Sequence, residues 1–331
     1  MVGSYFMKKI LRKRDALEYV FSPLKEPELV VEPEELFEVE TEDANMGKIR
    51  TPNDLPVPEV LGSTVEKVPW EANPVTGPIY VEGAERGDVL TVEILDVIPA
   101  EQGYNMFTPD NPLSDSVKWA ECKGPEVHII KHLPGPSGTT SDGKGTLDLD
   151  GRRVTWDLKP FIGTIATVPD IEIQSSLVGN GHYGGNMDCR DVCKGSKIYL
   201  PVYHRGALLY LGDVHATQGD SEFCGVADET RADVTLKCGV IKNRKIDYPR
   251  IEKPDSIIQI CCFKPLSSAI KQAILMLMDW LVTDYGMSRR EAYIHSSVNP
   301  DFRVHIYQMV DLLRIQYTVG AEIPKKYLPS T

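Results

Sequence analysis

Two polar, glycine-rich loops organise this chain: Gly179-Asn-Gly-His-Tyr-Gly-Gly-Asn-Met-Asp-Cys-Arg-Asp191 and, further on, Gly206-Ala-Leu-Leu-Tyr-Leu-Gly-Asp-Val-His-Ala-Thr-Gln-Gly-Asp-Ser-Glu222. Apolar runs at residues 197–203 and 207–211 flank the loops and indicate short strands. A sheet built from such strands presents the polar side chains of its loops at one rim. The loops contain imidazole, amide and carboxylate groups that are typical of metal and acid–base sites: His182, Asn186, Asp188, Asp213, His215, Gln218, Asp220 and Glu222.

The segments outside these loops are mostly strand-like. Residues 36–43 alternate between apolar and polar side chains, which predicts a half-buried strand that ends at Asp43. Residues 79–81 and 89–94 predict a β-hairpin around a turn at 85–88. Short strands separated by Gly, Pro and Asp turns favour a mainly β fold, either a sandwich or a barrel.

Helices are expected near the C-terminus. The longer one is predicted to begin at Ser267 or Ser268 as N-cap and to end at Gly286. A second, short helix is predicted to start at Ser288, whose capping box reaches Glu291.

The domain organisation follows from this pattern. We expect an N-terminal extension over residues 1–35, a β-sandwich or barrel core over 36–250, and a C-terminal α+β portion over 251–331 that packs on the core. Residues 100–150 are rich in Pro and Gly, and we interpret them as a long loop inserted in the core.

Composition limits the classes of partner. The chain has 331 residues, and 48 acidic against 36 basic side chains give a formal charge of -12, which disfavours nucleic acid and anionic membranes as partners. A small neutral or cationic molecule fits better. No uninterrupted apolar run approaches the roughly 20 residues of a membrane span, so we expect a cytoplasmic protein. Seven scattered cysteines indicate reduced thiols rather than a disulfide framework.

Five motifs, in order along the chain, resemble the acetamidase/formamidase family of amide hydrolases. They are Asn73-Pro-Val-Thr-Gly-Pro-Ile-Tyr-Val-Glu-Gly-Ala-Glu, Gly184-Gly-Asn-Met-Asp, Gly212-Asp-Val-His-Ala-Thr-Gln-Gly-Asp-Ser-Glu, Asp279-Trp-Leu-Val with Ser288-Arg-Arg-Glu-Ala-Tyr, and Ala321-Glu-Ile-Pro. The resemblance implies a jelly-roll-like β-sandwich with an added α+β portion that contains one long C-terminal helix. It also implies metal-dependent hydrolysis of a small carboxamide, such as formamide or acetamide, with release of ammonia.

One position departs from the family pattern. The family usually has His directly before Gly-Gly-Asn-Met-Asp, whereas here Tyr183 holds that place and His182 precedes it. A shift by one residue on an extended segment turns a side chain to the opposite face.

The chemistry of amide hydrolysis assigns roles to the loop residues. The reaction needs an activated nucleophile, stabilisation of an oxyanion and a proton for the departing nitrogen, and a bound divalent metal can supply the first two. With the resemblance, we predict Asp188 and His215 as metal ligands, Glu222 as ligand or general base, and Asp43 as a further ligand. Further candidates are Asp213 and Gln218 for catalysis, and Asn186, Gly185 and His182 for substrate binding.

The sequence leaves the metal and the reaction class open. Zn²⁺ is the expected metal, whereas an all-oxygen ligand set would suit Ca²⁺. A cysteine hydrolase is an alternative, with Cys189 or Cys193 as nucleophile, provided that its thiol pKa is depressed. A non-catalytic sandwich that binds a metabolite or carbohydrate is a third hypothesis. Sheet edges that tend to be covered also predict a homo-oligomer.

Overall fold

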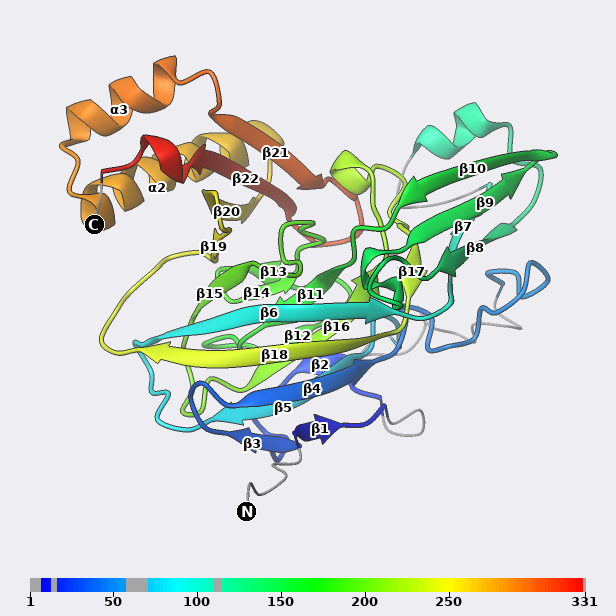
Figure 1. Cartoon of the computed structure of the whole chain (residues 1–331), viewed down its shortest axis with the longest axis horizontal. Helices are drawn as coiled ribbons and strands as arrows, with labels where there is room; N and C mark the ends of the chain where they lie inside the picture. Colours follow the sequence, from blue (N-terminus) through cyan, green and yellow to red (C-terminus); the bar gives the residue numbers. More distant parts are fainter. Residues whose placement is uncertain (1–6, 13–16, 58–70, 110–114, 330–331) are drawn as a thin grey trace.

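The structure is a computed structural model that describes residues 7–12, 17–57, 71–109 and 115–329. Parts of the predicted N-terminal extension therefore lie outside the described residues. Two large β-sheets pack face to face, and the C-terminal helices lie at one end of the molecule (Figure 1). The prediction of a mainly β chain with one long C-terminal helix is confirmed.

In the described part of the chain, the first sheet has nine strands, and all neighbouring pairs except β1–β4 are antiparallel. The strands in spatial order are β1 (Lys8–Ile10), β4 (Leu36–Thr41), β18 (Ala232–Ile241), β6 (Val89–Pro99), β15 (Lys197–Pro201), β19 (Arg250–Glu252), β20 (Ser256–Phe263), β22 (Tyr317–Pro324) and β21 (Arg303–Gln308).

The second sheet has eleven strands among the described residues, and a separate two-stranded sheet joins β2 (Val20–Phe21) to β12 (Gln174–Ser175). The main run of hydrogen-bonded strands in the eleven-stranded sheet is, in spatial order, β10 (Arg152–Asp157), β9 (Lys144–Leu149), β8 (Glu126–Leu133), β7 (Gln102–Phe107), β17 (Glu229–Thr230), β16 (Leu209–His215), β11 (Phe161–Ala166), β14 (Gly184–Asn186) and β13 (Asn180–Gly181). β5 (Val75–Val81) pairs with β16 and with β3 (Leu29–Val31).

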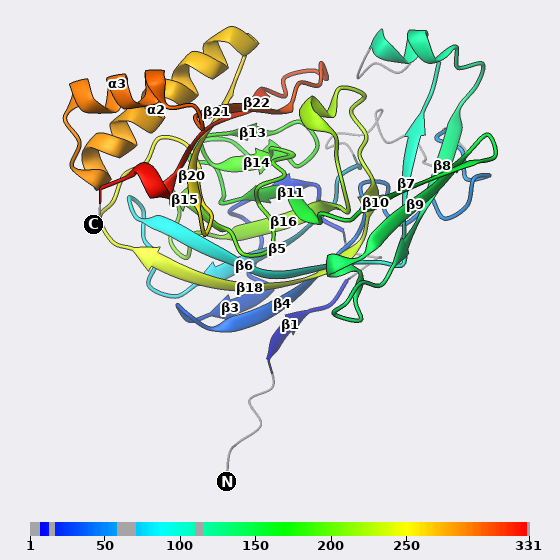
Figure 2. The same ribbon diagram turned by 45° about the horizontal axis from the view of Figure 1, so that its top comes forward.

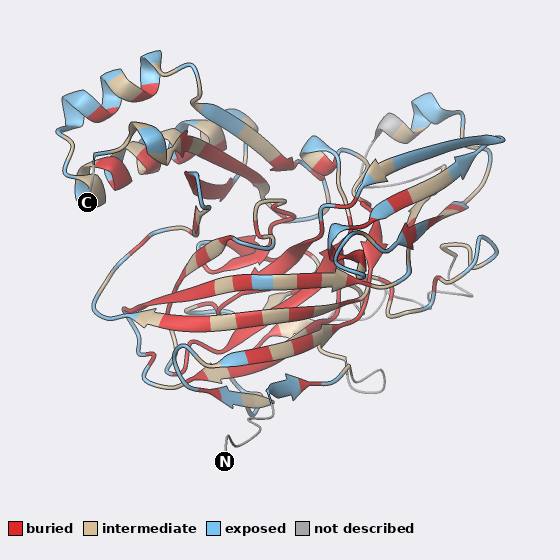
Figure 3. Ribbon diagram, in the orientation of Figure 1, coloured by how far each residue is buried: buried red, intermediate tan, exposed pale blue. Residues whose placement is uncertain are grey.

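The main hydrophobic core lies between the two sheets. Val92 and Val234 contribute from the first sheet, and Ile162, Ile165 and Leu211 from the second, all of them fully buried. Figure 3 shows the buried residues concentrated on these central strands. Because β11 and β16 lie at the centre of a buried sheet, polar residues on them are removed from bulk water.

The predicted hairpin around residues 85–88 is wrong in its pairing. Both strands exist, as β5 and β6, but β5 belongs to the second sheet and β6 to the first. The turn therefore carries the chain from one layer of the sandwich to the other. Local turn chemistry predicted the reversal of direction and not the change of sheet.

The predicted loop at residues 100–150 is also wrong. This region and the residues after it form β7, β8, β9 and β10, together with the short 3₁₀ helices η1 (Asp115–Ala120) and η2 (Thr140–Asp142). The four strands are consecutive antiparallel neighbours that project from the body in both views (Figures 1 and 2). The Pro and Gly residues of the region 100–150 fall mainly between these strands.

The C-terminal helices are α2 (Leu266–Tyr285) and α3 (Arg289–Val298), and a 3₁₀ turn, η4 (Lys325–Tyr327), follows β22. The predicted C-cap at Gly286 and the capping box at Ser288 are confirmed, whereas the N-cap of α2 is Pro265 rather than a serine. Among the described residues, α2 is the one helix long and apolar enough for a membrane span. Its buried residues share a second core with β20 and β22, which accounts for its apolar side.

Candidate active site

Four strands of the second sheet bring the polar residues of the two loops together. His215 ends β16 and pairs with Glu229 of β17 on one side and with Phe161 of β11 on the other. Asp188 follows β14, which pairs with β11. The prediction that Asp213 and His215 lie at a strand end is therefore confirmed.

The structure brings five buried ionisable residues into one centre. Asp188, His215 and Glu222 each offer a ligand atom, and these atoms lie within 4.8 Å of one another. Asp213, His215 and Glu229 form a second such group that shares the same imidazole. The Nε2 atom of His215 lies 3.5 Å from Oδ1 of Asp213 and 3.3 Å from Oε2 of Glu229.

Burial and mutual repulsion set the electrostatics of this centre. Burial and the nearby Asp213 carboxylate raise the pKa of Asp188 to about 7. Burial and the Asp188 carboxylate raise the pKa of Glu222 well above its ordinary value. Such shifts concentrate at functional sites, because a carboxyl group that holds a proton near neutral pH can donate or accept it.

The neighbours of His215 favour its charged form, whereas those of Asp188 and Glu222 disfavour theirs. Burial alone lowers the pKa of an imidazole, but Glu229 and Asp213 outweigh it and raise the pKa of His215 well above its ordinary value. The imidazole therefore lies in contact with two buried carboxylates, those of Asp213 and Glu229.

Three of the five residues have a left-handed backbone. The φ angles are +47° at Asp188, +53° at Asp213 and +42° at Glu222. Residues other than glycine adopt this conformation infrequently, and it persists where surrounding contacts enforce it, often at active sites. Glu222 lies in the short 3₁₀ helix η3 (Asp220–Glu222), in which Asp220 is exposed and Glu222 is buried.

A polar network holds the Asp213 side of the centre. Nδ2 of Asn73 donates to Oδ2 of Asp213 over 2.8 Å, and the Thr164 hydroxyl lies 3.3 Å from the same oxygen. That hydroxyl is also 2.9 Å from Oδ1 of Asn186, whose Nδ2 donates to the carbonyl of Leu177. Asn186 is therefore bonded within the fold at both ends of its amide, and its role in substrate binding stays a prediction.

Gly185 supports the site through close backbone contact. Its φ is +103°, and a Cβ atom at this position would lie 2.2 Å from the carbonyl oxygen of Gly179. Gly163 of β11 has a comparable role, since a Cβ there would lie 2.9 Å from Oδ1 of Asp188. Glycine at both positions lets the strands and the carboxylates approach one another.

His182 lies apart from the centre. It is exposed, whereas Tyr183 is buried, and both residues lie in the turn between β13 and β14 rather than on an extended segment. Its ring lines a surface pocket of about 330 Å³ with Arg86, Tyr203 and Arg244, and no member of the centre lines this pocket. A role for His182 in substrate binding stays a prediction that this placement does not favour.

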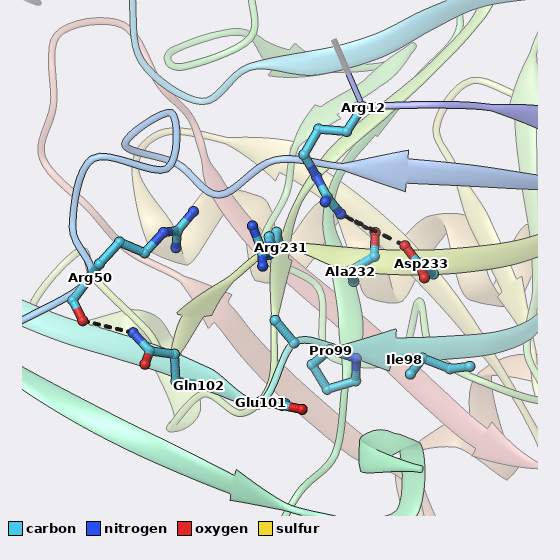
Figure 4. Close-up of a pocket in the computed structure, with 10 residues that line it drawn as sticks. Arg12, Arg50, Ile98, Pro99, Glu101, Gln102, Arg231, Ala232 and Asp233 are labelled. Carbon is cyan, nitrogen blue, oxygen red and sulfur yellow. Dashed lines mark hydrogen bonds and ion pairs between the residues drawn. The ribbon is translucent and has the colours of Figure 1, made fainter. Parts of the chain in front are cut away.

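Asp43 also lies outside both groups of candidate ligands. It is buried, and its carboxylate binds Nη1 of Arg50 at 2.9 Å and accepts hydrogen bonds from Tyr104 and two backbone amides. Arg50 in turn lines a pocket of about 550 Å³ together with Arg12 and Arg231, shown in Figure 4. These contacts make Asp43 a structural counter-ion for Arg50 in this structure.

Sequence reasoning missed Glu229. It follows Asp228 in a short strand with no motif around it, and only the antiparallel pairing of β16 with β17 places it opposite His215. Asn73 and Thr164 were missed for a similar reason, since their contacts with Asp213 span 140 and 49 residues of chain.

The two candidate nucleophiles, Cys189 and Cys193, are poorly suited to nucleophilic attack. Burial raises the pKa of Cys189 well above that of an ordinary thiol, and burial also raises the pKa of Cys193. Cys189 lies within the main hydrophobic core. A reactive cysteine requires the opposite shift, toward the thiolate.

The fold and the site define a mainly β protein of two packed sheets with a buried carboxylate–histidine centre. The sequence model described as the Acetamidase/Formamidase family matches residues 9–180 and 175–326. The chain belongs to the acetamidase/formamidase family.

Relatives and solved structures agree with this assignment. A formamidase from Methylophilus methylotrophus is 32% identical over 212 residues, which are 51% of this chain and 52% of that protein, so the chain spans about half the length of the curated relatives it matches. An acetamidase structure from Yersinia enterocolitica is 34% identical with a TM-score of 0.79, and covers 95% of this chain and 90% of its own. The crystal structure of a protein described as a predicted acetamidase/formamidase, from Thermoanaerobacter tengcongensis, has a TM-score of 0.80 at 27% identity. The match covers 97% of this chain and 96% of that chain.

Proposed function

We propose that this protein is an amidase that hydrolyses a small carboxamide, such as formamide or acetamide, to the carboxylate and ammonia. The observation that carries the proposal is the buried group of Asp188, His215 and Glu222. Family membership and the activities in the relatives' names support the same reaction. The raised pKa of the Cys189 thiol favours water over sulfur as the nucleophile.

We further propose that the centre binds a divalent metal ion. Oδ1 of Asp188 is fully buried and has no hydrogen-bond partner among the described residues, which is costly unless a cation contacts it. A ligand set of one imidazole and several carboxylates matches Zn²⁺. Since His215 belongs to both groups of candidate ligands, the donors favour Zn²⁺ over the all-oxygen preference of Ca²⁺.

The residues of the centre would divide the chemistry between them. When bound, a divalent cation supplies an electrophile that polarises the amide carbonyl and lowers the pKa of water. Asp188 and His215 would hold it, with the Asp213 and Glu229 carboxylates beside Nε2 of the imidazole. Hydrolysis joins the water oxygen to the carbonyl carbon and breaks the carbon–nitrogen bond. Glu222 would accept the proton that water loses and return it to the departing nitrogen.

Ammonia release tests the proposed activity directly. The purified protein is incubated with formamide, acetamide, a larger linear amide and a cyclic amide, and ammonia is measured over time. Turnover of at least one small amide is the expected result. Ligand-induced thermal stabilisation without ammonia from any amide would instead favour the non-catalytic binding protein.

Replacement of Cys189 by serine should leave most of the ammonia release intact. The thiol is buried in the core with a raised pKa, so it takes no part in the proposed reaction. Serine places a hydroxyl among apolar side chains, and some loss of thermal stability is expected. A folded Cys189→Ser protein without turnover would overturn the water mechanism in favour of a cysteine nucleophile.

A further inference from the structure

The amide of Gln218 contacts three parts of the structure at once. Oε1 lies 2.9 Å from Nδ1 of His215, and Nε2 donates to the backbone carbonyls of Asp188 and Tyr307 over 3.0 and 2.9 Å. Asp188 follows β14 and Tyr307 belongs to β21, so the contacts join the second sheet to the C-terminal portion. A further backbone bond, from Met309 to Ser221 over 2.9 Å, holds the segment after β21 against η3.

These contacts fix which end of the Gln218 amide faces His215. A backbone carbonyl only accepts hydrogen bonds, so the NH₂ group must face Asp188 and Tyr307. A flipped amide would direct its oxygen at two carbonyl oxygens and lose both bonds. Oε1 therefore faces the imidazole, and because it too only accepts, Nδ1 of His215 must carry the hydrogen.

The position of this hydrogen decides which ring nitrogen can bind a cation. With Nδ1–H directed at Gln218, Nε2 is the nitrogen that faces Asp213 and Glu229. Nδ1 carries this hydrogen whether the ring is neutral or positively charged, and the neutral ring leaves the lone pair of Nε2 free for a cation. A histidine that binds a metal ion commonly donates its other N–H to such a partner, which fixes its orientation.

We propose that Gln218 is a positioning residue that holds His215 with Nδ1 as donor and Nε2 directed into the site. The hydrogen bond from Gln218 to Tyr307 ties this arrangement to the C-terminal portion. This inference deepens the proposed function and rests on it for its consequence in metal binding. The sequence predicted Gln218 as a residue that takes part in catalysis. In the structure its oxygen and both hydrogens are instead bonded within the protein.

Two substitutions separate the acceptor role of Gln218 from its donor role. Gln218→Leu removes the acceptor and both donors, whereas Gln218→Glu keeps an acceptor for Nδ1–H. A matched control is Gln259→Leu, since Nε2 of Gln259 also donates to two carbonyls, those of Pro249 and Ile260, and its Oε1 accepts from Arg250. Gln259 lies in β20 and belongs to neither group of candidate ligands.

The test uses NMR of the histidine rings and zinc affinity measured with Zn²⁺ alone. Wild-type protein should show an exchange-protected Nδ1–H proton on His215, assigned by its loss in His215→Gln. Gln218→Leu should lose this signal and bind Zn²⁺ about 10- to 100-fold more weakly. Gln218→Glu should keep the signal, and Gln259→Leu should keep both the signal and the wild-type affinity despite a lower melting temperature.

Two results would overturn the inference. One is a wild-type protein in which Nδ1 of His215 carries no hydrogen, and this measurement does not depend on the folding of any variant. The other is a Gln218→Leu protein with an unchanged Nδ1–H signal or unchanged zinc affinity. A wild-type protein that binds no zinc and hydrolyses no amide would contradict the proposed function, while the NMR signal would still decide the role of Gln218.

Discussion

Replacement of His215 by alanine should reduce ammonia release below detection. The imidazole is buried, belongs to both groups of candidate ligands and contacts Asp213 and Glu229. Its removal takes away a proposed metal ligand and leaves buried carboxylates without their cationic neighbour. Breaking a buried ion pair by removing one partner typically costs about 3–5 kcal/mol, so a lower melting temperature is expected as well.

Two measurements separate lost chemistry from lost folding in this variant. Circular dichroism and the melting temperature report whether His215→Ala is folded at the assay temperature. His204→Ala is the matched control, because that half-buried histidine makes one hydrogen bond to a backbone carbonyl and lies outside the centre. A folded His215→Ala protein that keeps a substantial part of the wild-type kcat/KM would contradict the proposed site.

Replacement of Glu222 by glutamine should lower kcat by about 10²- to 10⁴-fold, the usual contribution of a positioned acid or base. Glutamine keeps the size of the side chain and can hydrogen-bond to Asp188, but it cannot accept and return a proton. The raised pKa of Glu222 and its burial in one group with Asp188 and His215 are the observations behind this prediction. The measurement is steady-state ammonia release at saturating amide.

The control for Glu222→Gln is Asp220→Asn in the same turn. Asp220 is exposed and pairs with Arg190 at the surface, so its substitution removes a charge without entering the centre. Asp220→Asn should retain activity close to that of the wild type. Equal losses in both variants would mean that the turn as a whole, rather than the Glu222 carboxyl group, is required.

The sequence predicted those features that depend on local pattern. The strand predicted over residues 36–43 is found as β4, which ends at Thr41, two residues earlier than predicted. The end of β16 at His215 and the capping box at Ser288 follow from alternation and from cap residues. The grouping of Asp188, His215 and Glu222 was predicted from two short loops and a family resemblance. Each of these signals lies within a few residues of chain.

The features that the sequence could not predict depend on contacts between distant segments. β5 and β6 belong to different sheets although their turn resembles that of a hairpin. Glu229 enters the centre only because β17 pairs with β16. The hydrogen bond from Gln218 to the carbonyl of Tyr307 joins residues that are 89 positions apart in the chain. The cytoplasmic location and the homo-oligomeric state remain predictions.

Ammonia release before and after metal removal is the most direct test of the account. One preparation is assayed with its best amide substrate as purified, after exhaustive chelation, and after addition of Zn²⁺, with the metal content measured at each stage. The account predicts about one divalent ion per chain, loss of turnover with loss of that ion, and recovery with Zn²⁺. Full turnover by protein that is shown to contain no metal would contradict it.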